Sequence, residues 1–117
     1  MGRGGAGASR PVPGAGLIFR RNRFADLVRR QLDLFATDEA DLLAEADEAE
    51  RAYDAAARED AEAAYADYQL VLEAGAERLA AIQAAYSATL EEDTRQEYEA
   101  AFARIAAKRF SRFAAGL

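Results

Sequence analysis

A single stripe of apolar positions runs through the middle of the chain, from residue 42 to residue 90. Its members are spaced four and three residues apart in a period of eleven, and one of them is polar. An eleven-residue period is close to that of a straight α-helix, so the stripe barely rotates around the axis. It predicts one helix over about 39–90, about 78 Å long at about 1.5 Å per residue. The stripe consists of Leu42, Ala46, Ala49, Tyr53, Ala57, Asp60, Ala64, Tyr68, Val71, Gly75, Leu79, Ile82, Tyr86 and Leu90.

Two residues of this stripe are places where the helix could break. Gly75 is the first, because glycine inside a helix costs about 1 kcal/mol relative to alanine. Asp60 is the lesser candidate, as the single polar member of the stripe. Beyond Gly16 the chain has no proline and only two glycines, so we expect a long helix to absorb the cost of Gly75.

Shorter helices are predicted on both sides, over about 20–35 and 94–113. In the first, apolar residues recur at helical spacing with one polar interruption, Gln31. We expect Asp38 to be the N-cap of the middle helix. The stretch TRQE predicts a capping box at the start of the last helix, formed by Thr94 and Glu97. The expected apolar faces are Phe24, Leu27, Val28, Leu34 and Phe35 in the first helix, and Tyr98, Phe102, Ile105, Phe110 and Phe113 in the last.

The predicted fold class is therefore all-α. A long, coiled-coil-like central helix carries a shorter antiparallel helix folded back at each end, because the predicted turns are short. Residues 17–117 form one helical domain in this interpretation. Residues 1–16 contain six glycines, both prolines and no acidic residue, a composition typical of a disordered tail.

Composition limits the chemistry that this domain can perform. The 117 residues include 31 alanines but no cysteine and no histidine, which excludes thiolate metal sites, cysteine nucleophiles and histidine-based triads. The acidic residues over 38–50 are typical of a solvated helix face, and Glu91, Glu92 and Asp93 of a turn. We expect no catalytic residues, no metal and no cofactor, and hence a protein that is not an enzyme.

Charge is arranged in three blocks along the chain. Residues 1–32 carry +6, residues 33–99 carry −16 and residues 100–117 carry +4, which gives the net charge of −6. We expect the basic N-terminal block to complement the acidic middle block within the molecule, and the basic end of the last helix to do the same. The possible basic interaction patch is Arg20, Arg21, Arg23, Arg29 and Arg30.

Function is predicted only as a class. The chain is interpreted as a helical protein–protein interaction or scaffold protein; the alternative is a nucleic-acid-associated protein that uses the basic N-terminal patch. A basic amphipathic helix on a membrane surface is a further alternative. We expect a cytoplasmic protein without a transmembrane segment.

An antiparallel homodimer is also predicted, because two short helices cannot cover a middle helix of about 78 Å. The uncovered segment is rich in alanine, whose small side chains allow two helices to approach closely. The possible dimer contact residues are Tyr53, Ala57, Ala61, Ala64, Tyr65 and Tyr68.

Overall fold

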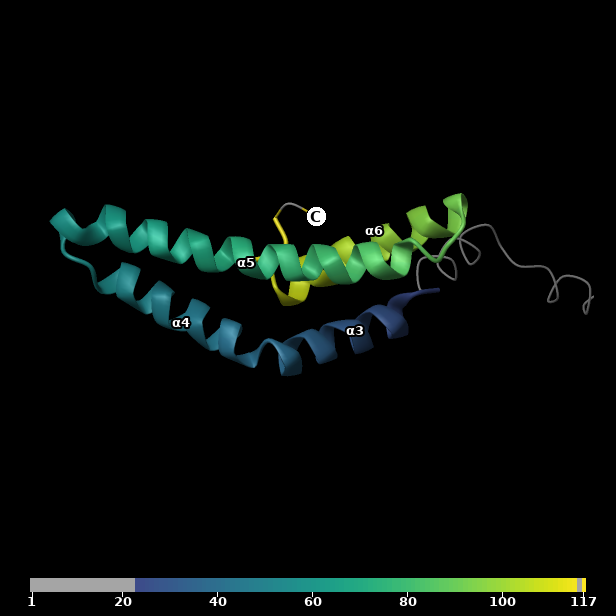
Figure 1. Cartoon of the computed structure of the whole chain (residues 1–117), viewed down its shortest axis with the longest axis horizontal. Coiled ribbons are helices and arrows are strands. Elements are labelled where there is room, and N and C mark those ends of the chain that lie inside the picture. Colours follow the sequence, from purple (N-terminus) through teal and green to yellow (C-terminus); the bar gives the residue numbers. More distant parts are fainter. Residues whose placement is uncertain (1–22, 116) are drawn as a thin grey trace, which may run out of the picture.

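The computed structural model describes residues 23–115 and residue 117. Within that part of the chain all regular secondary structure is helical, so the prediction of an all-α fold is confirmed. The disordered tail predicted for residues 1–16 lies outside the described residues. The elements in Figure 1 are α3 (Ala25–Asp38), α4 (Ala40–Ala55), the short 3-10 turn η1 (Arg58–Asp60), α5 (Ala61–Ser87) and α6 (Glu92–Arg109).

The prediction of one unbroken helix over 39–90 is wrong. The chain leaves the helix at Ala56 and Ala57, whose backbones are extended with ψ angles of 138° and 160°. It then turns through η1 and returns as α5, which packs against α4 as an antiparallel hairpin (Figure 1). The break therefore lies next to Asp60, the lesser of the two candidate positions, and α5 continues through Gly75.

The hairpin forms because it lets the apolar stripe pack on itself. Residues from the two halves of the stripe meet across the turn: the ring of Tyr53 stacks on that of Tyr68, with centroids 6.5 Å apart. Ala46 on α4 is fully buried in the core. One straight helix would leave the middle of this stripe in water, and burial of apolar area outweighs the modest helix preference of the alanines at the turn.

The first helix does not fold back on the next one, which corrects a second prediction. α3 continues into α4 almost end to end, interrupted only at Glu39, where φ is −110° and ψ is 30° (Figure 1). α3 extends through Asp38, so Asp38 does not cap α4. Leu34, assigned from sequence to the apolar face, is 62% exposed, whereas Leu32 is fully buried.

The last helix begins earlier than predicted, and the predicted capping box does not form. α6 starts at Glu92, and no side chain caps its first turn. The preceding turn is held instead by Arg95, which donates to the backbone carbonyls of Ser87 at 3.2 Å and Leu90 at 2.7 Å. These carbonyls lie at the end of α5 and just beyond it, where a cationic side chain is stabilising.

The core lies where α3, α5 and α6 meet. α6 runs antiparallel to α5 and parallel to α3, as shown by the ring contacts of Tyr98 with Tyr86 and Phe24. The apolar face predicted for the last helix is confirmed for Tyr98, Phe102 and Ile105; α6 ends at Arg109, before the predicted end at 113, but Phe110 and Phe113 still pack in the core. The buried core cluster is Phe24, Val28, Leu32, Phe35, Ala46, Leu79, Tyr98, Ala101, Phe102, Ala106, Phe113 and Ala114.

The segment after α6 crosses the joint between this core and the α4–α5 hairpin. Its Phe113 ring lies directly against Gly75 of α5, and a Cβ atom added at Gly75 would be only 2.3 Å from Phe113 Cδ1. The neighbouring Arg112 donates to Asp47 at 2.6 Å and to Glu50 at 2.7 Å, both on α4. The segment therefore contacts both arms of the hairpin, and Gly75 is required for the close approach.

Spin labels attached at Asp38→Cys and Ala81→Cys test whether the chain forms the α4–α5 hairpin. Both residues line the same hollow, so we expect a short distance between the labels. One unbroken helix would separate them by about 65 Å, from 43 residues at about 1.5 Å each. Pulsed electron spin resonance measures the distance. A value close to that of the unbroken helix would contradict the hairpin.

Gly75→Ala is expected to lower the free energy of unfolding. The added methyl group collides with the buried Phe113 ring, at a cost of about 1–3 kcal/mol for overpacking, against a gain of about 1 kcal/mol in helix propensity. Urea denaturation measures the difference.

The control for Gly75→Ala is the same change in a Phe113→Ala background, where the colliding ring is gone. There we expect Gly75→Ala to be neutral or stabilising. An equal loss of stability in both backgrounds would show that contact with Phe113 is not the reason for the glycine.

Tyr98 should ionise at a higher pH than a tyrosine ordinarily does. Burial has the largest effect on the pKa of its phenol and raises it. The hydrogen bond with Gln31 lowers the pKa by less than burial raises it, and the neighbouring Tyr86 and Glu99 raise it further. The folded chain holds this proton more tightly than the unfolded chain. Its contribution to stability is therefore complete below about pH 10 and is lost as the pH rises through the raised pKa.

Tyrosinate absorbance during an alkaline titration measures this ionisation. Tyr98→Phe should remove an ionisation above the ordinary range of tyrosine and reduce the loss of unfolding free energy above about pH 10. The matched control is Tyr65→Phe, at a residue that is 45% exposed. If Tyr65→Phe removed that ionisation instead, the burial argument for Tyr98 would be refuted.

Candidate interaction surface

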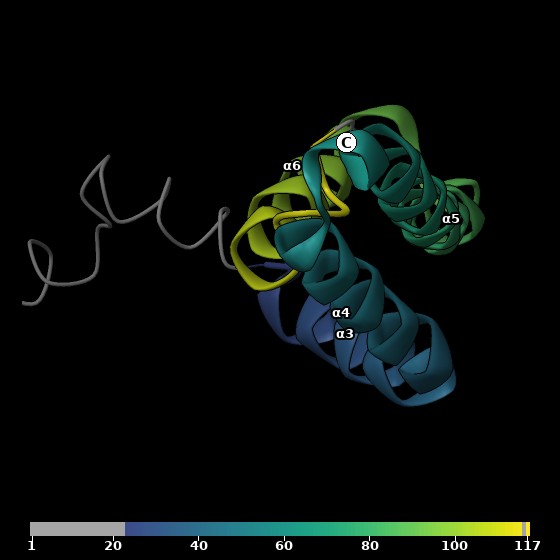
Figure 2. The same ribbon diagram turned by 90° about the vertical axis from the view of Figure 1, so that its left-hand side faces the viewer.

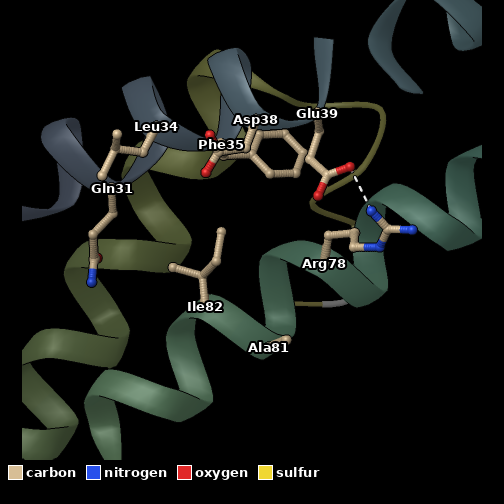
Figure 3. A pocket seen from close by; sticks show the side chains of 8 residues that line it. All are labelled: Gln31, Leu34, Phe35, Asp38, Glu39, Arg78, Ala81 and Ile82. Atoms are coloured by element: carbon tan, nitrogen blue, oxygen red, sulfur yellow. Dashed lines mark hydrogen bonds and ion pairs between the residues drawn. The ribbon is translucent and has the colours of Figure 1, made fainter. Parts of the chain in front are cut away.

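The first hollow on the molecule lies between α3 and α5 and has a volume of about 370 Å³. Figure 3 shows Leu34 and Phe35 of α3 on one side and Ile82 and Ala81 of α5 on the other. An ion pair from Arg78 to Glu39 spans one end of it. Its lining is Gln31, Leu34, Phe35, Asp38, Glu39, Arg78, Ala81 and Ile82.

A second hollow of about 420 Å³ lies between α4 and α5 in the hairpin. Its apolar lining residues are three alanines, Val71 and Leu70, and Leu70 is 64% exposed. The lining residues are Glu45, Glu48, Ala49, Ala52, Ala64, Asp67, Leu70 and Val71.

The two hollows lie on the same side of α5 and share no lining residue, and the Arg78–Glu39 ion pair lies at the end of the first hollow that is nearer the second. Ala64 and Val71 line the second hollow and Arg78 lines the first, and these positions are seven residues apart. Seven residues fall only about 20° short of two full helical turns, so all three face the same way. The opposite wall is α3 in the first hollow and α4 in the second, two helices that follow each other end to end. We call the combined feature the groove.

α6 lies on the other side of α5 from the groove. Ala81 lines the groove, whereas Gln83, two residues and about 200° further around the helix, donates to the backbone carbonyl of Glu99 on α6 at 3.5 Å. Ser87, buried on the same side as Gln83, donates to the carboxylate of Glu99. α6 lies against α3 and α5, on one side of both helices (Figure 2). The groove is on the side that α6 leaves uncovered.

The rim of the groove is strongly acidic. Arg78 is the one cation among its lining residues, and it already pairs with Glu39. Glu48 pairs with Arg51 of its own helix, and both side chains remain exposed. The other three carboxylates make no ion pair with any residue that the structure describes. The five acidic lining residues are Asp38, Glu39, Glu45, Glu48 and Asp67.

The predicted basic patch is only partly described. Arg20 and Arg21 lie outside the described residues. Arg23 pairs with Glu97 of α6 at 3.4 Å, and Arg29 pairs with Asp26 one turn before it on α3. Arg30 is exposed on the same helix.

Charge complementarity within the chain therefore differs from the prediction. The described N-terminal arginines do not contact the acidic stretch over 38–50, because α3 precedes that stretch end to end and does not fold back on it. The basic end of the chain does contact it, as expected, through Arg112 with Asp47 and Glu50. Arg109 reaches Asp33 of α3 at 2.6 Å. Burial lowers the pKa of Arg112, but the hydrogen bond and charge of Asp47 raise it by more.

The predicted dimer contact residues lie at or near the tip of the hairpin. The ring of Tyr53 is 5.2 Å from that of Tyr65 and 6.5 Å from that of Tyr68, so the three tyrosines form a cluster within one chain. Tyr53 and Tyr65 remain 37% and 45% exposed. Ala64 lines the groove, while Ala57 and Ala61 belong to the turn and to the start of α5. The uncovered middle helix on which the dimer prediction depended does not exist.

In residues 23–115 and 117 no three acidic side chains are grouped so that they could hold a metal ion together. None of the helices there has both the length and the apolar character needed to cross a membrane.

Sequence reasoning did not identify the groove. Ile82 and Val71 belong to the predicted central stripe, and no prediction names Leu70. One signal was present in the sequence: Asp38, Glu45 and Glu48 recur at helical spacing along one side of the chain. What it could not reveal is that the returning helix would provide a second wall.

Comparisons with known proteins add no relationship. No protein-family model matches the chain, and no curated protein or solved structure is significantly similar to it. Inferences about function therefore depend on the surface of the molecule itself.

Proposed function

We propose that this chain is a non-enzymatic interaction or scaffold protein that binds a helix of a partner protein in the groove. The observation that carries the proposal is the groove itself, an apolar depression between two helices on the side of the molecule that α6 does not cover. Laying the apolar face of a helix into such a groove is a recurring mode of recognition.

The dimensions of the groove suit a helix. Along α5 it extends from Ala64 to Ile82, which is about 27 Å at about 1.5 Å per residue. A partner helix of about 18 residues would cover that length. Leu34 and Leu70 are exposed large apolar residues in the two hollows, and contact with a partner would remove both from water.

A homodimer stays a prediction, but a two-fold contact through the groove is disfavoured. Such a contact would place the acidic rim of one copy against the identical rim of the other, and like charges that face each other are destabilising. The exposed tyrosines at the hairpin tip, Tyr53 and Tyr65, are the better surface for a second copy.

The nucleic-acid alternative also stays a prediction. Arg29 and Arg30 are exposed, which favours it. The acidic surface of α4 and of the first half of α5 opposes it, since these carboxylates would repel phosphate.

Photo-crosslinking in the cells that naturally produce the protein tests the proposal. Benzoylphenylalanine would replace Leu34 or Leu70 in the groove or, as the control, the exposed Ala100 on α6. We expect a discrete protein adduct from both groove positions and none from Ala100.

Other results would contradict the proposal. Equal yields from Ala100 would show that contact is not specific to the groove. An adduct at twice the chain mass of 12.7 kDa would assign the groove to a second copy, and an adduct that nuclease removes would favour the nucleic-acid alternative.

A further inference from the structure

From the charge and shape of the groove we infer that its partner is a cationic amphipathic helix of another protein, with a narrow apolar face and arginines or lysines along both edges. This inference rests on the proposed function and specifies the chemistry of the partner. It depends on three observations. The rim of the groove is negatively charged, the side chains on part of its floor are small, and the described helices of this chain have neither a free apolar face nor a positive charge that would fit it.

The rim selects for positive charge. Five carboxylates and one already paired guanidinium line the groove, and the acidic residues occur on both walls. Glu45 lies on α4 and Asp67 on α5, so a helix lying between them would pass a carboxylate on each side. Cationic side chains long enough to extend from an apolar face to either wall would meet these carboxylates, whereas acidic ones would be repelled.

The floor selects for a closely packed helix. In the second hollow it is formed largely by Ala49, Ala52 and Ala64, whose small side chains allow a helix axis to come near. In the first hollow the larger Leu34 and Ile82 offer apolar area. A partner helix with one apolar residue per turn on one face, and long cationic side chains on both sides of that face, would cover both hollows.

The described helices of this chain do not meet these requirements as free partners. α3 and α6 already use their apolar faces in the core, through Val28 and Phe102 for example. The charged residues of α6 are four acids and four bases, so its net charge is zero. The helices that the structure describes in a second copy would therefore bring neither a free apolar stripe nor a positive charge, and this is why we assign the groove to a different protein.

A synthetic peptide tests the assignment on the full-length chain. The probe is an 18-residue helical peptide with leucine at helical spacing on one face and arginine or lysine elsewhere. The matched peptide keeps the leucines and replaces every cation with glutamate. We expect the cationic peptide to bind, as measured by calorimetry, and the acidic peptide not to bind.

Two double variants locate the binding site. Glu45→Lys with Asp67→Lys reverses both walls of the groove and should weaken binding of the cationic peptide roughly tenfold, about 1.4 kcal/mol. Glu62→Lys with Glu73→Lys changes the net charge by the same amount on the side of α5 away from the groove, and should change the affinity by less than about twofold. All four residues are exposed, and circular dichroism verifies that both variants remain folded.

Three results would overturn the inference. Absence of binding by the cationic peptide is the first, and equal weakening by both double variants is the second, since that would reflect net charge alone. Third, tighter binding after Arg20→Glu with Arg21→Glu would mean that the chain's own N-terminal segment competes for the groove. In each case an adduct at Leu34 and Leu70 in the crosslinking experiment would still support the proposed function, so the two failures are distinguishable.

Discussion

The contact of Phe113 with Gly75 determines how the two halves of this molecule are joined. α5 is longer than either of its neighbours, and its apolar residues pack against α4 near the hairpin turn and against α6 further along. The segment after α6 enters where these two partners meet. A side chain at position 75 would push the Phe113 ring away, so the absence of a Cβ atom allows the core and the hairpin to share one helix.

The same arrangement explains the groove. Three helices of a bundle can surround a core completely only if each contacts the other two, but here α6 occupies one side and the pair formed by α3–α4 and α5 is open on the other (Figure 2). The bend at Glu39 keeps α3 and α4 on the same wall along the whole length of α5. The uncovered side therefore has one straight wall, α5, and one wall that bends where α3 meets α4 (Figure 1), and its two hollows lie on either side of that bend.

Charge has a different role on the two sides of the molecule. On the side of α6 and of the segment after it, arginines neutralise the acidic helices: Arg109 pairs with Asp33, and Arg112 with Asp47 and Glu50. Exposed ion pairs of this kind contribute little to stability, typically about 0–1 kcal/mol each, but they favour one orientation of the segment. On the side of the groove the acidic residues outnumber the cations, and that excess gives the groove a negative electrostatic potential.

The sequence by itself determined the helical class and the apolar positions Tyr98, Phe102 and Ile105 of α6. These properties are local: alanine-rich stretches favour helix, and residues three or four positions apart share a face whatever the rest of the chain does. The contact of a basic C-terminal residue with the acidic stretch over 38–50 was also predictable. Residues of opposite charge attract each other without any particular geometry, so the charge blocks of the sequence are enough to suggest the pairing. The helical spacing of Asp38, Glu45 and Glu48 was visible in the sequence as well, but not the fact that these residues line the groove.

Only the tertiary structure decided where the stripe folds and what that creates. No glycine or proline near Ala56 and Ala57 indicates a turn in the sequence. Alanine has the highest helix propensity, so these two residues by themselves would favour a continuous helix. The reversal depends on apolar contacts between residues far apart in the sequence, such as those of Tyr53 with Tyr68, and a one-dimensional pattern does not specify which half of a stripe will cover the other. The groove depends on the same reversal, since its two walls become neighbours only after the chain has doubled back.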